Sequence, residues 1–183
     1  MRRVLPLVFL ALTTFGCSSD DGSGSDGAAG SGCPNDGSSY DSEAQQLECD
    51  VLTLVNQVRA RGATCGGEAM PAVGSLRMNA PLRTAARNHA IDMATHDYFD
   101  HDSQDGTTAF ERMTSAGYGW STAGENIAAG SGTAQGVMDQ WMNSPGHCKN
   151  IMSGAFVDIG IGYRMQAGSA YTHYWVQDFG SPR

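Results

Sequence analysis

The sequence predicts an α+β domain, and three observations lead to that fold class. Apolar residues recur at helical spacing in the first half of the chain, whereas from Val157 onward they alternate with small or polar residues. About 140 residues follow the N-terminal segments. A chain of that length can bury about two thirds of its unfolded surface in one core. We therefore expect one domain over residues 43–183, with helices early and strands late.

The first predicted helix begins at a capping box formed by Ser42 and Gln45. Apolar residues follow it at helical spacing up to a stop at Gly62, namely Leu47, Val51, Leu54, Val55 and Val58. After a glycine-rich loop, Pro81 marks the start of a second helix, whose alanine-rich face also carries His89. We interpret His89 as a packed histidine that makes a hydrogen bond rather than as a ligand.

A polar and aromatic segment over residues 96–102 breaks the helical period, so we expect a surface loop there. Thr108 and Glu111 then form a second capping box, which predicts a short helix. Two side chains of this helix are expected to face inward, those of Phe110 and Met113.

Thr133 can cap a further helix, which has Trp141 on its inward face as a core residue. This helix should end at the turn formed by residues 144–146, Ser-Pro-Gly. Beyond it, residues 157–165 and 171–179 have the alternation and the aromatic content of strands, and a short Ala-Gly-Ser segment lies between them. The pattern predicts an antiparallel hairpin.

The chain begins with a pattern typical of an export signal. Two arginines follow Met1 and precede an almost wholly apolar stretch, residues 4–15, that is too short to span a membrane. Gly16 before Cys17 is similar to the lipobox of bacterial lipoproteins, in which the signal peptide, here residues 1–16, is removed and the new N-terminal cysteine is acylated. Lipidation of Cys17 is expected, and nearby cleavage with release into the medium is the alternative.

Residues 17–42 are expected to form a flexible tether. Residues 18–32 are only Ser, Gly, Asp and Ala, so they offer no apolar surface to offset the entropy lost on ordering. Removal of the signal with its two arginines leaves 11 − 2 = 9 basic residues against 19 acidic residues, a formal charge of −10. This acidity argues against a nucleic-acid partner, and the lipid anchor is the only membrane contact that we expect.

Besides Cys17 the chain contains four cysteines, an even set that suits disulfides in an oxidising compartment. Their spacing is not the C-x-x-C type that binds zinc. Three pairings are possible, and we expect Cys65 with Cys148 and Cys33 with Cys49. Closing the longer loop would contribute about 4 to 5 kcal/mol in the loop-entropy model.

Four short motifs occur in one order along the domain: Tyr98-Phe99-Asp100-His101, Gly124-Glu125-Asn126-Ile127-Ala128, Trp141-Met142-Asn143-Ser144-Pro145-Gly146-His147 and Gly160-Ile161-Gly162. Together with the closing motif at residues 176–180, they resemble the CAP superfamily of cysteine-rich secretory proteins, antigen 5 and pathogenesis-related-1 proteins. The chain is similar to the bacterial branch from about Gln46 to Gly180. The resemblance implies a three-layer α-β-α sandwich with a central antiparallel sheet and an open cleft.

The resemblance also implies a site in that cleft, where family members carry two histidines and two acidic residues. His101 and His147 match the histidines, which in some members bind zinc or a similar divalent ion, and Glu125 matches one acidic residue. Ser144 stands at the second acidic position, so the set of four is incomplete. A zinc ion would be held by His101 and His147, with water completing its coordination. The alternative is a hydrogen-bonded polar cluster without metal.

Two functions from different classes follow from the resemblance. The favoured one is an extracellular binding module for a lipid, a surface polymer or a protein. The alternative is a zinc-dependent hydrolase or protease in which Glu125 is the general base, although the chain has no HExxH motif. A third hypothesis makes Ser144 a nucleophile and His147 its base, but the Gly-x-Ser-x-Gly motif is also missing. We therefore expect binding rather than catalysis.

Overall fold

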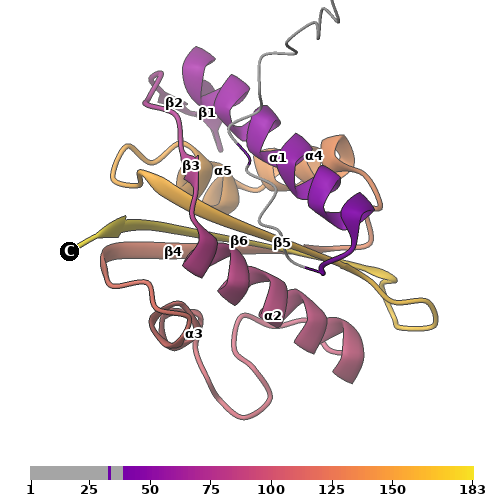
Figure 1. The fold of residues 1–183 in the computed structure, drawn as a ribbon. Helices are drawn as coiled ribbons and strands as arrows, with labels where there is room; N and C mark the ends of the chain where they lie inside the picture. Colours follow the sequence, from indigo (N-terminus) through magenta and orange to yellow (C-terminus); the bar gives the residue numbers. More distant parts are fainter. Residues whose placement is uncertain (1–32, 34–38) are drawn as a thin grey trace, which may run out of the picture.

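Two layers of helices enclose a four-stranded sheet in this computed structural model, which describes Cys33 and residues 39–183. The predicted signal peptide, Cys17 and most of the predicted tether lie outside the described residues. One layer contains α1 (Ser42–Arg61), α4 (Ala134–Asn143) and α5 (Pro145–Ile151), and the other contains α2 (Ala80–His96) and α3 (Ala109–Ser115) (Figure 1). The chain therefore forms the three-layer sandwich that the family resemblance implied.

The central sheet has the strand order β3-β5-β6-β4. Its strands are β3 (Arg77–Met78), β4 (Trp120–Ala129), β5 (Asp158–Met165) and β6 (His173–Pro182). The pair β5 and β6 is the predicted hairpin, and β6 also pairs antiparallel with β4, a segment to which sequence analysis assigned no element. Strand β3 runs parallel to β5, so the expected antiparallel sheet has one parallel pair at its edge. A separate small hairpin joins β1 (Ala63–Cys65) to β2 (Glu68–Met70).

The first helix ends at its predicted stop and begins one residue away from its predicted cap. Asp41, not Ser42, is the N-cap, and its side chain accepts a hydrogen bond from the backbone N of Ala44 at 2.8 Å. Gly62 follows the helix with φ of +78°, a conformation that favours glycine. Tyr40 already packs on the domain, because the Arg87 guanidinium lies 4.0 Å from the centroid of its ring.

The short helix α3 has the predicted capping box, since the Thr108 hydroxyl accepts from the Glu111 backbone N and the Glu111 carboxylate accepts from the Thr108 backbone N. Met113 is fully buried, as predicted. The prediction for Phe110 was wrong, because this side chain is 43% exposed and packs against Trp120. Ala109 lies one turn before Met113 and takes the inward position, which leaves its neighbour Phe110 outside.

The predictions for α4 are confirmed, and the segment after it forms a helix that was not predicted. The Thr133 hydroxyl caps α4, and Trp141 is fully buried. The turn at Ser144 ends α4, but Pro145 then occupies the first position of α5, where the missing N–H of proline costs nothing.

Both expected disulfides are present, Cys65–Cys148 and Cys33–Cys49.

Helix α2 packs directly on the backbone of β5, because two of the β5 residues that face this helix are glycines. A Cβ atom at Gly160 would lie 2.0 Å from the carbonyl carbon of Leu82, and one at Gly162 would lie 2.3 Å from that of Ala86. The opposite face of β5 packs into the core formed by α1 and α4. Residues 158–163 are therefore all buried, although their sequence alternates.

Glu48 of α1 joins the two helical layers at the edge of the sheet. Its buried carboxylate accepts hydrogen bonds from Arg83 Nε at 2.8 Å and from Arg87 Nη2 at 2.7 Å, both on α2, and from the backbone N of Tyr163 at 3.3 Å. Strand β3 covers only the first two residues of β5. Glu48 thus accepts a hydrogen bond from a backbone N–H on the edge of β5 that β3 leaves unpaired, and its bonds to the two arginines hold α1 to α2.

Replacing Gly162 by Ala should lower the free energy of unfolding by about 3 kcal/mol, because the added methyl group meets helix backbone that cannot move aside. Urea denaturation of the purified protein measures this change. The matched control is Gly119→Ala, where a Cβ meets no atom within 4 Å and which should change stability by less than about 0.5 kcal/mol. Equal stability of the two variants would contradict the packing argument.

Candidate functional site

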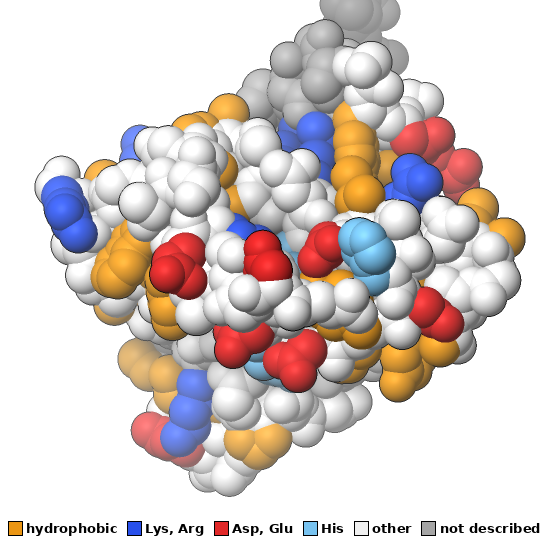
Figure 2. Space-filling model, turned by 90° about the horizontal axis from the view of Figure 1, so that it is seen from below, with side chains coloured by type: hydrophobic (Ala, Val, Ile, Leu, Met, Phe, Trp, Pro, Cys, Tyr) orange, Lys and Arg blue, Asp and Glu red, His pale blue; other side chains and the backbone are white. Residues whose placement is uncertain are grey.

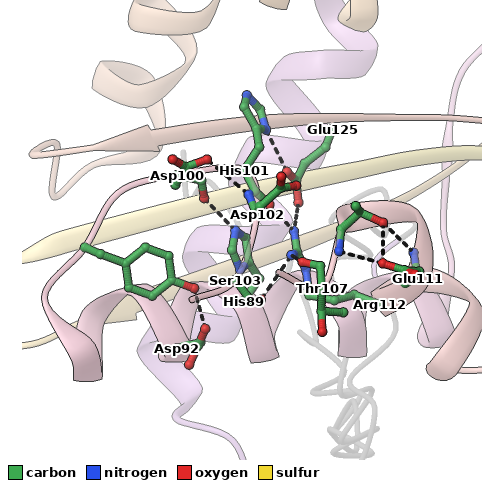
Figure 3. Close-up of polar contacts among 12 residues, drawn as sticks. His89, Asp92, Asp100, His101, Asp102, Ser103, Thr107, Glu111, Arg112 and Glu125 are labelled. Carbon is green, nitrogen blue, oxygen red and sulfur yellow. Dashed lines mark hydrogen bonds and ion pairs between the residues drawn. The ribbon is translucent and has the colours of Figure 1, made fainter. Parts of the chain in front are cut away.

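His101 and Glu125 contact each other directly. The Nδ1 atom of His101 donates to Oε1 of Glu125 at 2.7 Å (Figure 3). His101 lies in the loop between α2 and α3 with its side chain 53% exposed, whereas Glu125 lies on β4 with its side chain only 3% exposed. The pair therefore presents an imidazole to solvent and holds it from behind with a buried carboxylate.

Arg112 of α3 binds the other oxygen of that carboxylate. Its Nη2 atom donates to Oε2 of Glu125 at 2.7 Å and to the carbonyl oxygen of His101 at 2.8 Å. Its Nη1 atom donates to the Ser103 hydroxyl and to the carbonyl oxygen of Thr107. One guanidinium thus fixes the loop that carries His101 to the strand that carries Glu125 (Figure 3).

His147 lies in the first turn of α5, and a buried network of amide side chains holds it near Glu125. The side chain of Asn126, the residue after Glu125, donates to the carbonyl oxygen of His147 at 3.2 Å and to Gln177 Oε1 at 3.1 Å. Asn150 of α5 donates to the side-chain oxygen of Asn126 at 2.9 Å. These bonds attach the start of α5 to β4. Within the described residues the half-buried His147 imidazole makes no hydrogen bond of its own.

The two histidines differ in their readiness to carry a charge. The hydrogen bond from His101 to Glu125 raises the pKa of His101 above its ordinary value. Burial lowers the pKa of His147, and the nearby charge of His101 lowers it further. His147 is therefore neutral at neutral pH.

Asp178 of β6 lies opposite Glu125 in the register of the two strands and is fully buried. Burial raises the pKa of Asp178 well above its ordinary value, and the charge of Glu125 adds to the effect. Asp178 therefore takes up a proton more readily than an ordinary aspartate, which reduces the repulsion between the two carboxyl groups. His101 and Arg112 both bind the charge on Glu125.

Ser144 does not join the other three predicted residues through its side chain. It separates α4 from α5, and its backbone bonds belong to those helix ends. In the described part of the chain its hydroxyl makes no hydrogen bond to His101, Glu125 or His147. Nor do any three His, Cys, Asp or Glu side chains among residues 33 and 39–183 form a group that could hold a metal ion.

Sequence analysis missed Arg112 and Asp178. A clue to Arg112 was present, because the capping box at Thr108 fixes the start of α3 and a buried glutamate needs a cation nearby. Asp178 was quoted only as part of the closing motif. A carboxyl group within the aromatic and apolar stretch from Tyr174 to Phe179 indicates a buried acid, but its partner on β4 depends on strand pairing.

Comparison with known proteins identifies a matching family and relatives of this chain. The model of the CAP family, described as the cysteine-rich secretory protein family, matches residues 52–179. The uncharacterized protein YkwD of Bacillus subtilis (strain 168) is 34% identical over 164 residues, which are 90% of this chain and 60% of YkwD. This chain thus spans less than two thirds of that relative.

Solved structures agree with the match. An extracellular protein containing an SCP domain from Bacillus anthracis str. Ames has a TM-score of 0.63 and 26% identity, over 75% of this chain and 41% of that one. An outer surface protein from Borrelia burgdorferi shares the fold with a TM-score of 0.61 and 19% identity, over 78% of this chain and 95% of that one. On the match of the family model to most of the described domain, this chain belongs to the CAP family of cysteine-rich secretory proteins.

Proposed function

We propose that this chain is an exported, lipid-anchored binding module whose cleft at His101, Glu125 and His147 contacts its ligand and holds a divalent metal ion weakly. The hydrogen bonds and the burial of Glu125 are the main support for this proposal. A general base must be able to take a proton from water. Both oxygens of Glu125 are already bonded, one to His101 and one to Arg112, and its side chain is buried. This arrangement suits recognition better than proton transfer.

Two features support weak metal binding. Histidines that bind metals commonly donate their second ring nitrogen to a carboxylate, as His101 does to Glu125, which leaves Nε2 of His101 available. Burial keeps His147 neutral, the form that binds metal. With two imidazoles as protein ligands, the ion would be completed by water and would exchange readily. A bound zinc ion would supply a positive charge that attracts an oxygen of the ligand.

The disulfides support export, and the net charge limits the class of ligand. The two disulfides suit an oxidising compartment. No helix among the described residues is both long and apolar enough to cross a bilayer. We propose membrane attachment through an acylated Cys17, because Gly16-Cys17 after the apolar N-terminal stretch is similar to a lipobox. The formal charge of −8 for the whole chain disfavours nucleic acid and leaves a lipid, a surface polymer or a protein as the ligand.

Calorimetric titration of the purified protein with zinc should give weak, saturable binding that is lost in His101→Ala and in His147→Ala, because each variant leaves one protein ligand. His96→Ala is the matched control, since His96 is exposed on α2 and bonds only to Asp92 within the described chain. Binding that persists in both cleft variants would place the ion elsewhere and contradict the proposed metal site.

The same protein should not hydrolyse peptides. Hydrolysis that disappears with a chelator and in Glu125→Gln would make the chain a metal-dependent hydrolase, and the binding-module proposal would fail. Hydrolysis that neither change affects would come from a contaminant.

Histidine titration by NMR in metal-free protein should give a pKa above 6.5 for His101 and below 6.5 for His147. Glu125→Gln should lower the pKa of His101, because the variant removes its anionic partner. Asp102→Asn, next to His101 but not bonded to its ring, should change the pKa of His101 little.

Since the folded-state pKa of His101 is raised, its contribution to stability is complete below about pH 6.5 and is lost as the pH rises through the folded-state pKa. Equal His101 pKa values in wild type and Glu125→Gln would refute the role given to Glu125.

The mass of the mature protein from its native host should correspond to a chain that begins at Cys17 and carries a diacylglycerol group. Cys17→Ala should lack this modification and should be recovered from the soluble fraction. An unmodified N-terminus at another residue in the wild-type protein would show that the chain is released after ordinary cleavage.

A further inference from the structure

Phe99 and Tyr171 form an exposed aromatic pair at one end of the molecule. Phe99 lies in the loop after α2 and is 40% exposed, and Tyr171 lies in the turn between β5 and β6 and is 47% exposed. Their ring centroids are 5.6 Å apart, and their planes are tilted by 56°. The C-terminal end of α2 and the end of the β5–β6 hairpin lie side by side (Figure 1). Two rings from distant parts of the chain thus share one patch of surface.

The backbone on both sides of this aromatic pair is held in place. The Asp97 carboxylate accepts a hydrogen bond from the backbone N of Ala170 at 2.6 Å, which joins the loop after α2 to the hairpin turn. Asp97 and Thr172 have φ of +56° and +65°, and they are the non-glycine residues with positive φ in the part of the chain that the structure describes. This conformation is unfavourable, above all for a β-branched residue such as Thr172. The fold sustains it, and Tyr171 is thereby kept beside Phe99.

Asp100, the residue after Phe99, is fixed to α2 through its backbone. Its carbonyl oxygen lies 2.9 Å from Nε2 of His89, a histidine that is 1% exposed. A carbonyl oxygen only accepts, so Nε2 donates, and His89 is the packed, hydrogen-bonded histidine that the sequence predicted. The exposed carboxylate of Asp100 accepts from the backbone N of Asp102 through Oδ1. Its Oδ2 atom has no partner among the described residues and is available to a ligand.

The surroundings of the aromatic pair are acidic. No Lys or Arg occurs from residue 88 to residue 111, whereas this stretch contains five aspartates, at positions 92, 97, 100, 102 and 105. Asp97 and Asp100 lie on either side of Phe99 in the sequence, and both are exposed. Figure 2 looks onto the side of the molecule formed by α2 and the loop after it, where acidic side chains gather. Such a surface attracts cations and repels anions.

The basic side chains of the neighbouring segments have other partners. His96 and His101, the two exposed histidines of this region, are each paired with a carboxylate other than those of Asp97 and Asp100. Arg164 of the hairpin lines a cavity at the N-terminal end of α1. Within the described residues, therefore, neither Asp97 nor Asp100 forms an ion pair.

We propose that the aromatic pair docks a segment of a partner protein that carries arginine or lysine side chains. A guanidinium group can stack on the ring of Phe99 or Tyr171 and donate to the carboxylate of Asp97 or Asp100. The same carboxylates repel an anionic membrane surface, and a neutral saccharide would leave their charge unpaired. This inference rests on the proposed binding function and selects a protein as the ligand.

The test is a titration of the purified protein with the peptide Gly-Arg-Gly-Arg-Gly, with both ends blocked, followed by NMR of the aromatic ring signals. The peptide should shift the signals of Phe99 and Tyr171 saturably, and binding should weaken at high salt because exposed charges are screened. Replacing both peptide arginines by citrulline keeps their shape and removes their charge. This change should weaken binding at least about tenfold.

The variants Phe99→Leu and Tyr171→Leu keep an apolar contact between the loop and the hairpin but remove the ring faces. Each should weaken peptide binding about three- to fivefold, and the double variant at least about tenfold. Phe110→Leu is the matched control, because Phe110 is a similarly exposed ring on α3, at 43%, and this variant should bind normally. Asp100→Asn should weaken binding about threefold, whereas Asp139→Asn, at an exposed position of α4, should not.

Three outcomes would overturn the inference. Equal binding of the arginine and citrulline peptides would exclude recognition of charge. Binding that the two ring variants leave unchanged would show that the net acidity of the protein attracts the peptide without this surface. Tighter binding of maltotriose or of phosphatidylglycerol vesicles than of the arginine peptide at the same rings would make the surface a saccharide site or a membrane site.

Failure of this inference can be told apart from failure of the proposed function. Zinc binding in the cleft without peptide binding would refute the docking surface alone. Peptide binding in a protein that also hydrolyses peptides through Glu125 would refute the binding-module proposal and leave the docking surface in place. In His147→Ala the arginine peptide should bind normally whether or not zinc does.

Discussion

The close contact between α2 and β5 controls where the residues of the candidate site can lie. The backbone of the helix lies against Gly160 and Gly162 without intervening side chains, which fixes the height of α2 over the sheet. The Glu48 carboxylate fixes α2 laterally through two arginines and covers the edge of the same strand. These two sets of contacts fix the position of α2. The loop that follows the C-terminus of α2 then brings His101 into contact with Glu125 on β4.

A single negative charge organises the site. Glu125 is buried, and a buried carboxylate is stable only when it is paired. Arg112 and His101 each bind one of its oxygens, and the raised pKa of the opposed Asp178 favours its neutral form. Glu125 thereby holds the His101 imidazole in place.

The predictions that succeeded rest on local chemistry, and those that failed depended on distant neighbours. The capping boxes and stops at Thr108, Thr133 and Gly62 involve atoms within one turn of the chain, so sequence spacing shows them directly. Phe110 was placed inward because helical period alone does not say which face meets the core. The β4 segment is rich in Ala and Gly, has no strand-like composition, and becomes a strand because β6 offers it a partner in register.

The cysteine pairs that the structure contains were one of three possible pairings, and His101, Glu125 and His147 were named from the resemblance of short motifs to a family. The order of residues along the chain was enough to predict the α+β class, the α-helices with strong caps and the closing hairpin. These features follow from periodicity, capping and motifs, which are properties of neighbouring residues. Folding in three dimensions was needed to place Arg112 and Asp178 beside Glu125. Hydrogen bonds and charges act over a few ångströms in space, so their partners are set by how strands and helices pack and not by their separation along the chain.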